Sequence, residues 1–219
     1  MQGDLSKQYL PVDGKMILFH TLSVFELSPD IDEIILVVPE EDIPMVRQMI
    51  IEHRGMSKVH HVMAGGKQRQ DSVRNGLAAV DDQADIVLIH DAVRPFISEG
   101  LIRLTVREAE KHDAVTVGMP VKDTIKRVDT GGWIVETLNR QVLWMTQTPQ
   151  AFRRSVIQEA YRRADEDQFY GTDDASLVER TGCRVKMIAA YYANLKITTP
   201  EDLLMAEFLI KNIKREGIW

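Results

Sequence analysis

The sequence predicts an α/β protein with a doubly wound, mostly parallel sheet and a protruding β-hairpin. Three observations lead to this prediction. Short apolar runs alternate with longer amphipathic stretches, which is typical of strands and helices in turn. Several of the runs are almost entirely apolar, as expected of parallel strands covered on both faces. A later segment alternates around a glycine turn and has no helix of its own to cover it.

The apolar runs and the amphipathic stretches give the expected elements in order. Strands are predicted at residues 34–38, 59–63, 86–90, 114–119 and 184–190. Helices are predicted at residues 16–27, 41–53, 70–80, 99–111 and 153–165, with a further helix opening at 171–172 and a closing helix from 200. Thr199 suits the N-cap of the closing helix, because Pro200 fits its first position and two carboxylates follow. Regular strand–helix alternation implies right-handed crossovers.

The hairpin is predicted from residues 121–128 and 133–138, joined by a turn at 129–132. We expect a single domain over residues 1–219, with residues 121–140 as a β-arm subregion. Two strands are too few to fold alone. The arm is therefore expected to pack on another subunit, with a local flap on its own domain as the alternative.

Composition limits the classes of function. The chain has 219 residues, of which 44% are hydrophobic and 27% charged, and its net charge is −6. This charge argues against a general nucleic-acid binder. The single cysteine, Cys183, excludes an intramolecular disulfide and suits a reducing compartment. No apolar run is long enough for a membrane span, and residues 1–9 lack a signal-peptide core. We therefore expect a cytoplasmic protein.

Polar residues follow two of the predicted strands, where open parallel sheets bind their ligands. Gly65 and Gly66 follow the strand at 59–63, and the next helix directs its amide groups toward whatever lies there. A tight strand-to-helix turn would explain this pair equally well. Asp91 follows the strand at 86–90 and suits Mg²⁺ or a ribose hydroxyl. Alternatively, it caps a helix or pairs with Arg94.

Cations are spread along the chain. Lys7 lies near the start, Lys196 follows the last strand, and the hairpin carries Lys122, Lys126, Arg127 and Arg140. Their charge suits a phosphate monoester, although each one alone is equally consistent with a solvated surface. We find no metal-ligand spacing of His with Cys, and no nucleophile–base motif.

Taken together and in order, a set of short motifs resembles the cytidylyltransferase family of the methylerythritol phosphate route to isoprenoids. The resemblance runs from Met1 to about Leu209. The motifs are Lys7-Gln8-Tyr9, Gly65-Gly66 with Arg69 and Ser72, His90-Asp91-Ala92-Val93-Arg94-Pro95, Asp123-Thr124-Ile125-Lys126-Arg127, Thr148-Pro149-Gln150, Thr172-Asp173-Asp174-Ala175-Ser176 and residues 194–199.

The resemblance implies a homodimer of Rossmann-like subunits whose hairpin arms embrace, so that the hairpin is a dimerisation arm. It implies a reaction of CTP with 2-C-methyl-D-erythritol 4-phosphate in the presence of Mg²⁺, with pyrophosphate as the second product. By the same resemblance, Lys7 and Lys196 are the catalytic cations. The nucleotide residues are Gly65, Gly66, Arg69, Ser72 and Asp91, with Asp91 also beside the metal. The acceptor residues are Arg94, Thr124, Arg140, Thr148 and Thr172.

The sequence departs from the family pattern in two places. The family opens with a buried strand and a glycine-rich loop, which the resemblance places ahead of Met1 and which are missing from the sequence. Lys67 and Gln68 stand where acids are common, so side-chain contacts to the cytosine are in doubt at those positions. Two alternatives remain: the same chemistry on ribitol 5-phosphate, or a catalytically inactive dimeric scaffold if the missing segment is truly absent.

Overall fold

The computed structural model describes residues 6–52 and 55–216. The strands are β1 (Pro11–Val12), β2 (Lys15–Met16), β3 (Ile34–Val38), β4 (Val59–Ala64), β5 (Ile86–Ile89), β6 (Ala114–Pro120), β7 (Lys126–Val128), β8 (Ile134–Thr137), β9 (Trp144–Arg153) and β10 (Lys186–Ala189). The α-helices are α1 (Ile17–Leu27), α2 (Ile43–Glu52), α3 (Arg69–Leu77), α4 (Glu99–His112), α5 (Arg154–Glu166), α6 (Asp174–Arg180) and α7 (Pro200–Glu216). Short 3₁₀ helices are η1 (Lys7–Tyr9), η2 (Glu40–Asp42) and η3 (Arg140–Val142).

The main sheet has the strand order β10-β6-β9-β5. β10 is parallel to β6, whereas β9 is antiparallel to both of its neighbours. Three of the four strands therefore run in one direction, and the predicted α/β class with a mostly parallel sheet is confirmed. Within the described residues, β3 and β4 form a separate parallel pair. One continuous sheet, as the alternation suggested, is therefore not observed there.

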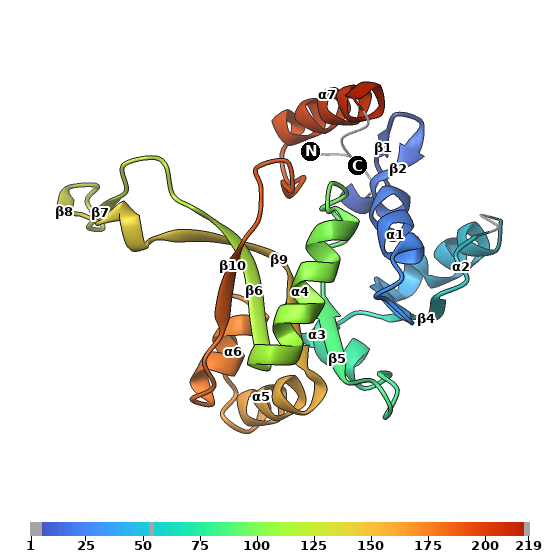
Figure 1. Ribbon diagram of the computed structural model, residues 1–219, viewed down its shortest axis with the longest axis horizontal. Helices are drawn as coiled ribbons and strands as arrows, with labels where there is room; N and C mark the ends of the chain where they lie inside the picture. Colours follow the sequence, from blue (N-terminus) through green and yellow to red (C-terminus); the bar gives the residue numbers. More distant parts are fainter. Residues whose placement is uncertain (1–5, 53–54, 217–219) are drawn as a thin grey trace.

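Helices cover both faces of the main sheet (Figure 1). Successive residues of β6 point to opposite faces, as strand geometry requires. Ala114 packs with Ile157 of α5 and Leu177 of α6, whereas Val115 packs with Ile102 of α4. All of these residues are buried. This two-sided burial explains why the predicted strands read as continuous apolar runs.

One strand was missed. β9 pairs with β5 and β6 over residues for which no element was predicted, and α5 begins directly after it. Its buried stretch includes Thr148 and Gln150, so it lacks the apolar run that identifies the other strands. The polar side chains are accommodated because each has hydrogen-bond partners.

The predicted helix ends are largely confirmed. Thr199 Oγ1 accepts a hydrogen bond from Asp202 N at 3.2 Å, so it caps α7 as expected. α6 begins at Asp174 rather than at residues 171–172, because Asp173 is its N-cap and accepts from Ser176 N at 2.9 Å. The predicted helix 41–53 is divided into η2 and α2, and its last residue lies outside the described part. No helix within residues 6–52 and 55–216 combines the length and apolar character that a membrane span requires.

The predicted hairpin is present as the antiparallel pair β7 and β8, with Lys126 opposite Thr137. All seven of its strand residues are exposed. Figure 1 shows it projecting well away from the body of the molecule. Its role as a dimerisation arm stays a prediction.

Candidate active site

The site is centred on Asp91, directly beyond the carboxyl end of β5. Its side chain is 10% exposed and is approached by three cations. Asp91 Oδ1 lies 3.2 Å from Arg69 Nε, and Oδ2 lies 3.3 Å from Arg94 Nε and 3.0 Å from Lys196 Nζ. Burial favours a higher pKa for Asp91, but the charges of Lys196, Arg69 and Arg94 outweigh it and hold the pKa below its usual range. The carboxylate is therefore ionised.

Arg69 reaches this centre from the first position of α3. Gln68 is the N-cap of that helix, and Asp71 Oδ2 accepts a hydrogen bond from Gln68 N at 3.0 Å. Arg69 Nη1 also lies 2.8 Å from Asp174 Oδ2. Burial opposes the charged guanidinium, but Asp174 and Asp91 together raise the pKa of Arg69. One arginine thus joins the carboxyl end of β5 to the start of α6.

The two glycines form a turn with little room for a side chain, above all at Gly66. A Cβ on Gly66 would lie 2.2 Å from Asp71 Cβ, and one on Gly65 would lie 2.9 Å from Ser72 Oγ. Gly66 N donates to Ser72 Oγ at 3.0 Å, and that hydroxyl donates in turn to Gln68 O at 3.2 Å. Ser72 therefore stabilises the turn itself, in addition to any contact with a nucleotide base.

Thr148 and His90 fix the backbone around Asp91. Thr148 Oγ1 accepts from Asp91 N at 3.1 Å and also lies 3.1 Å from His90 Nδ1. His90 Nε2 lies 3.1 Å from Arg94 O, a carbonyl that can only accept, so Nε2 carries the ring proton and Nδ1 of the neutral ring accepts from the Thr148 hydroxyl. Desolvation by the surrounding protein lowers the pKa of His90 to about 4, so the ring is neutral. This chain of contacts holds the turn between residues 90 and 94.

The loop after β10 packs against the same turn. Arg94 Nη1 donates to Asn194 O at 2.9 Å, and Ile197 N donates to Val93 O at 2.9 Å. Burial lowers the pKa of Arg94, although Asp91 opposes this effect. Lys7 Nζ donates to Thr198 O at 2.7 Å. Lys7 and Lys196, which are 189 positions apart in the sequence, therefore meet at one loop.

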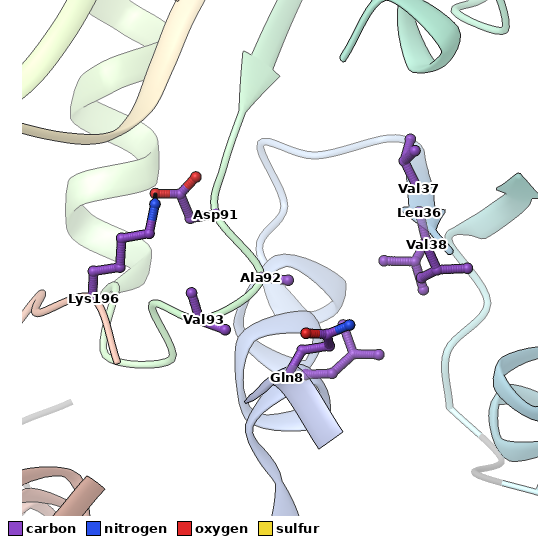
Figure 2. Close-up of a pocket in the computed structure, with 9 residues that line it drawn as sticks. Gln8, Leu36, Val37, Val38, Asp91, Ala92, Val93 and Lys196 are labelled. Carbon is purple, nitrogen blue, oxygen red and sulfur yellow. Dashed lines mark ion pairs between the residues drawn. The ribbon is translucent and has the colours of Figure 1, made fainter. Parts of the chain in front are cut away.

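A cavity of about 230 Å³ opens beside this loop. Asp91 and Lys196 point toward each other on one side of it, whereas Leu36 and Val38 of β3 lie on the other (Figure 2). Gln8 lies near the middle of the view. The cavity thus has a charged wall and an apolar wall.

The predicted residues fall into two groups. The structure brings most of them to the Asp91 cluster or into its supporting loops: Lys7, Gly65, Gly66, Arg69, Ser72, Asp91, Arg94, Thr148 and Lys196. Thr172 is exposed and immediately precedes the N-cap of α6. Thr124 and Arg140 lie on the arm, and Arg140 donates to Lys122 O. The arm projects away from the cluster (Figure 1).

Sequence reasoning missed three residues of this centre. Asp174, His90 and Asn194 were parts of the quoted motifs, but no role was assigned to them. Each is buried or nearly so, and each makes at least one contact with a residue distant in the sequence. Their position beside predicted site residues could have identified them, because a polar residue that is buried near a site needs a hydrogen-bond partner there.

The donor set limits how a metal can bind. No group of three or more His, Cys, Asp or Glu side chains that could hold a metal occurs in the described residues. Mg²⁺ commonly uses one or two carboxylates together with substrate phosphates. Asp91 therefore fits an ion that is carried mainly by a nucleotide.

Comparison with known proteins gives one consistent result. The sequence model of the family described as IspD, 2-C-methyl-D-erythritol 4-phosphate cytidylyltransferase, matches residues 1–212. A protein of that name from Geotalea uraniireducens (strain Rf4) is 49% identical over 218 residues, which are 99% of this chain and 93% of the relative. Another, from Syntrophus aciditrophicus (strain SB), is 46% identical over 99% of this chain and 92% of the relative.

Solved structures agree with the sequence relatives. The 4-diphosphocytidyl-2C-methyl-D-erythritol synthase from Anaerococcus prevotii DSM 20548 has a TM-score of 0.86 and 34% identity, covering 94% of this chain and 91% of that one. The 2-C-methyl-D-erythritol 4-phosphate cytidylyltransferase from Thermus thermophilus has a TM-score of 0.81 and 31% identity, covering 94% of each chain. The chain therefore belongs to the 2-C-methyl-D-erythritol 4-phosphate cytidylyltransferase family.

Proposed function

We propose that this chain transfers a cytidylyl group from CTP to 2-C-methyl-D-erythritol 4-phosphate, giving 4-diphosphocytidyl-2-C-methyl-D-erythritol and pyrophosphate. The observation that carries the proposal is the meeting of Arg69, Arg94 and Lys196 around Asp91, with Lys7 at the adjoining loop, in a chain of this family. Such a concentration of cations suits a reaction between two polyanions.

The chemistry needs no general base. An oxygen of the acceptor phosphate attacks the α-phosphorus of CTP and forms a new P–O bond. The bond from the α-phosphorus to the bridging oxygen breaks, and pyrophosphate leaves with that electron pair. The protein must place both phosphates in line and stabilise the charge of the transition state. This requirement agrees with a site built from cations, in which His90 is neutral and engaged through both ring nitrogens.

Each cation has a proposed role that follows from its position. Lys7 and Lys196, which meet at the loop after β10, act on the reacting phosphates as catalytic residues. Gly65, Gly66, Arg69 and Ser72 form the nucleotide side, at the turn after β4 and the first turn of α3. Mg²⁺, bound through the triphosphate and Asp91, would supply further positive charge to the phosphates.

The acceptor side is proposed to include Arg94, Thr148 and Thr172 of one subunit, with Thr124 and Arg140 from the partner subunit's arm. The arm supports this homodimer because it exposes large apolar side chains: Trp133 is 77% exposed and Ile134 is 64% exposed. Surfaces of this kind are typical of protein interfaces. In the dimer, the basic residues of each arm would lie near the phosphate of the acceptor bound to the other subunit.

The proposal is tested by pyrophosphate release from purified protein with CTP, Mg²⁺ and 2-C-methyl-D-erythritol 4-phosphate. We expect turnover that requires all three, and less than about a tenth of it with ribitol 5-phosphate as acceptor. Comparable rates with ribitol 5-phosphate would favour the sister activity. No turnover by a folded dimer would favour the scaffold alternative and contradict the proposal.

A matched pair of lysine variants tests the catalytic role of Lys7. Lys7→Met should lower kcat roughly a hundredfold, because one contact to transition-state charge contributes about 3 kcal/mol. Lys111→Met removes an equal charge from an exposed lysine of α4 that pairs with Glu108, and should leave kcat unchanged. Equal rates for both variants would exclude Lys7 from the chemistry.

A further inference from the structure

Asp174 is a buried carboxylate to which the mechanism above gives no role. It is the first residue of α6, and its side chain is 1% exposed. Tyr161 of α5 donates its hydroxyl to Asp174 Oδ1 at 2.6 Å. Oδ2 has no partner with hydrogen-bond geometry among the described residues, but it lies 2.8 Å from Arg69 Nη1. A buried carboxylate needs a cation, and Arg69 is the one that the described residues supply.

The start of α6 is fixed to the main sheet by Gln150, which is fully buried in β9. Gln150 Nε2 donates to Asp173 Oδ2 at 2.7 Å and to Thr116 Oγ1 at 3.0 Å. Gln150 Oε1 accepts from Ala175 N at 3.0 Å. The residues on both sides of Asp174 are therefore held by one side chain. In its pair with Arg69, which is 37% exposed, the acid is the fixed member.

Arg69 bridges two carboxylates that belong to different parts of the fold. Its Nε lies 3.2 Å from Asp91 Oδ1, while its Nη1 lies 2.8 Å from Asp174 Oδ2. A guanidinium is planar and its donors point in fixed directions, so two acids at two of its edges determine its plane. The positive charge of Arg69 is therefore balanced by Asp91 and Asp174 together.

We propose that Asp174 is a positioning residue for the nucleotide site, which holds the Arg69 guanidinium in place at the carboxyl end of β5. The inference rests on the proposed CTP site. Without the Asp174 charge, Asp91 alone would hold Arg69, and the guanidinium would either pair fully with Asp91 or turn toward solvent. Either movement removes it from the place where it meets the triphosphate.

Asp174→Asn tests the proposal, because it keeps the side-chain shape and an acceptor for Tyr161. We expect KM for CTP, and the Kd for CTP measured by calorimetry without acceptor, to rise about tenfold, while kcat changes less than about threefold. Asp167→Asn is the control. It removes an exposed acid that pairs with Arg180 at the other end of α6, and it should change neither constant.

A double-mutant cycle separates positioning from a merely structural role. If Asp174 acts through Arg69, adding Asp174→Asn to Arg69→Met should change the Kd for CTP by less than about twofold. Effects that multiply in the double variant would overturn the proposal. An unchanged Kd in the single Asp174→Asn variant would also overturn it.

Thermal melting tests the proposal even if the single variant Asp174→Asn folds poorly. Arg69→Met leaves the buried carboxylate without its cation and should lower Tm by roughly 5–10 °C. Adding Asp174→Asn should then restore part of that loss. A further fall in Tm would mean that Asp174 stabilises the fold independently of Arg69 and would overturn the proposal. If wild-type protein binds CTP but transfers nothing, the proposed function fails while the cycle still tests Asp174.

Discussion

Replacing Asp91 with Asn tests whether one carboxylate holds the candidate site together. The substitution keeps the size of the side chain but removes the charge that Arg69, Arg94 and Lys196 share. Arg94 is affected most, because its side chain is only 11% exposed. Asn194 O, at 2.9 Å, is then the one remaining hydrogen-bond acceptor among the partners described for its guanidinium.

The magnitude follows from the burial of each cation. Breaking a buried ion pair by removing one partner costs about 3–5 kcal/mol. The side chains of Arg69 and Lys196 are 37% and 40% exposed, so water replaces most of what they lose, and each adds no more than about 0.5 kcal/mol. Asn194 O still accepts a hydrogen bond from Arg94 and offsets part of its loss, so the total cost of Asp91→Asn is about 3 kcal/mol. For a chain of this length, Tm should fall by roughly 6–12 °C.

Calorimetry and urea unfolding measure this effect. The m-value should stay unchanged, because the substitution alters stability and not the surface exposed on unfolding. The control is Asp82→Asn, which removes a 90% exposed acid that lies 2.7 Å from Arg154 and should cost less than about 1 kcal/mol. If Asp91→Asn melts within about 2 °C of the wild type, the three cations do not depend on Asp91 and the reasoning is refuted.

Three further predictions test the turn, a loop and the arm. Gly66→Ala should lower the free energy of unfolding by about 1–3 kcal/mol and weaken CTP binding, because the new Cβ would collide with Asp71. Gly100→Ala is the control: its Cβ would have no neighbouring side chain nearer than 3.9 Å, so thermal melting should show a neutral or slightly stabilising effect. Glu26→Gln should lower Tm by about 2–6 °C at pH 7, because Glu26 accepts four hydrogen bonds from residues 57 and 58. Burial raises the pKa of Glu26, but these bonds lower it overall. The ionised carboxylate therefore stabilises the fold at pH values above the pKa of the unfolded chain, near 4.3, and the difference in Tm between variant and wild type should narrow as pH falls below about 4. A Tm difference that widens in acid would contradict this. Trp133→Ser should shift the protein toward monomer in light scattering, and an unchanged mass would remove Trp133 from the proposed interface.

The elements that the sequence predicted well are those with a local signal. Helices α1, α3, α4 and α5 lie within three residues of their predicted ends, because amphipathic periodicity is set by neighbouring residues. The cap of α7 was predicted for the same reason. β9 was missed because its buried polar residues are explained only by partners elsewhere in the fold, such as Thr116 and Asp173 for Gln150.

The candidate site was predicted as a set of residues but not as an arrangement. Asp91, Arg94 and Lys196 were named separately, and in the structure they lie together. No pattern indicated that Arg69, which contacts Asp91, also pairs with Asp174, 105 positions away in the sequence. The roles of all these residues stay predictions.

The sequence by itself determined the α/β class, most element positions and the family resemblance, because each depends on local periodicity or on short motifs in order. Tertiary structure alone decided the antiparallel place of β9, the division of the strands into two sheets, and the pairing of charges. These depend on contacts between residues distant in the chain. The contact of His90 Nδ1 with the hydroxyl of Thr148, 58 positions away, shows the difference, because no local pattern indicates it. Burial then makes such contacts strong, since a buried polar group must find its partner within the fold.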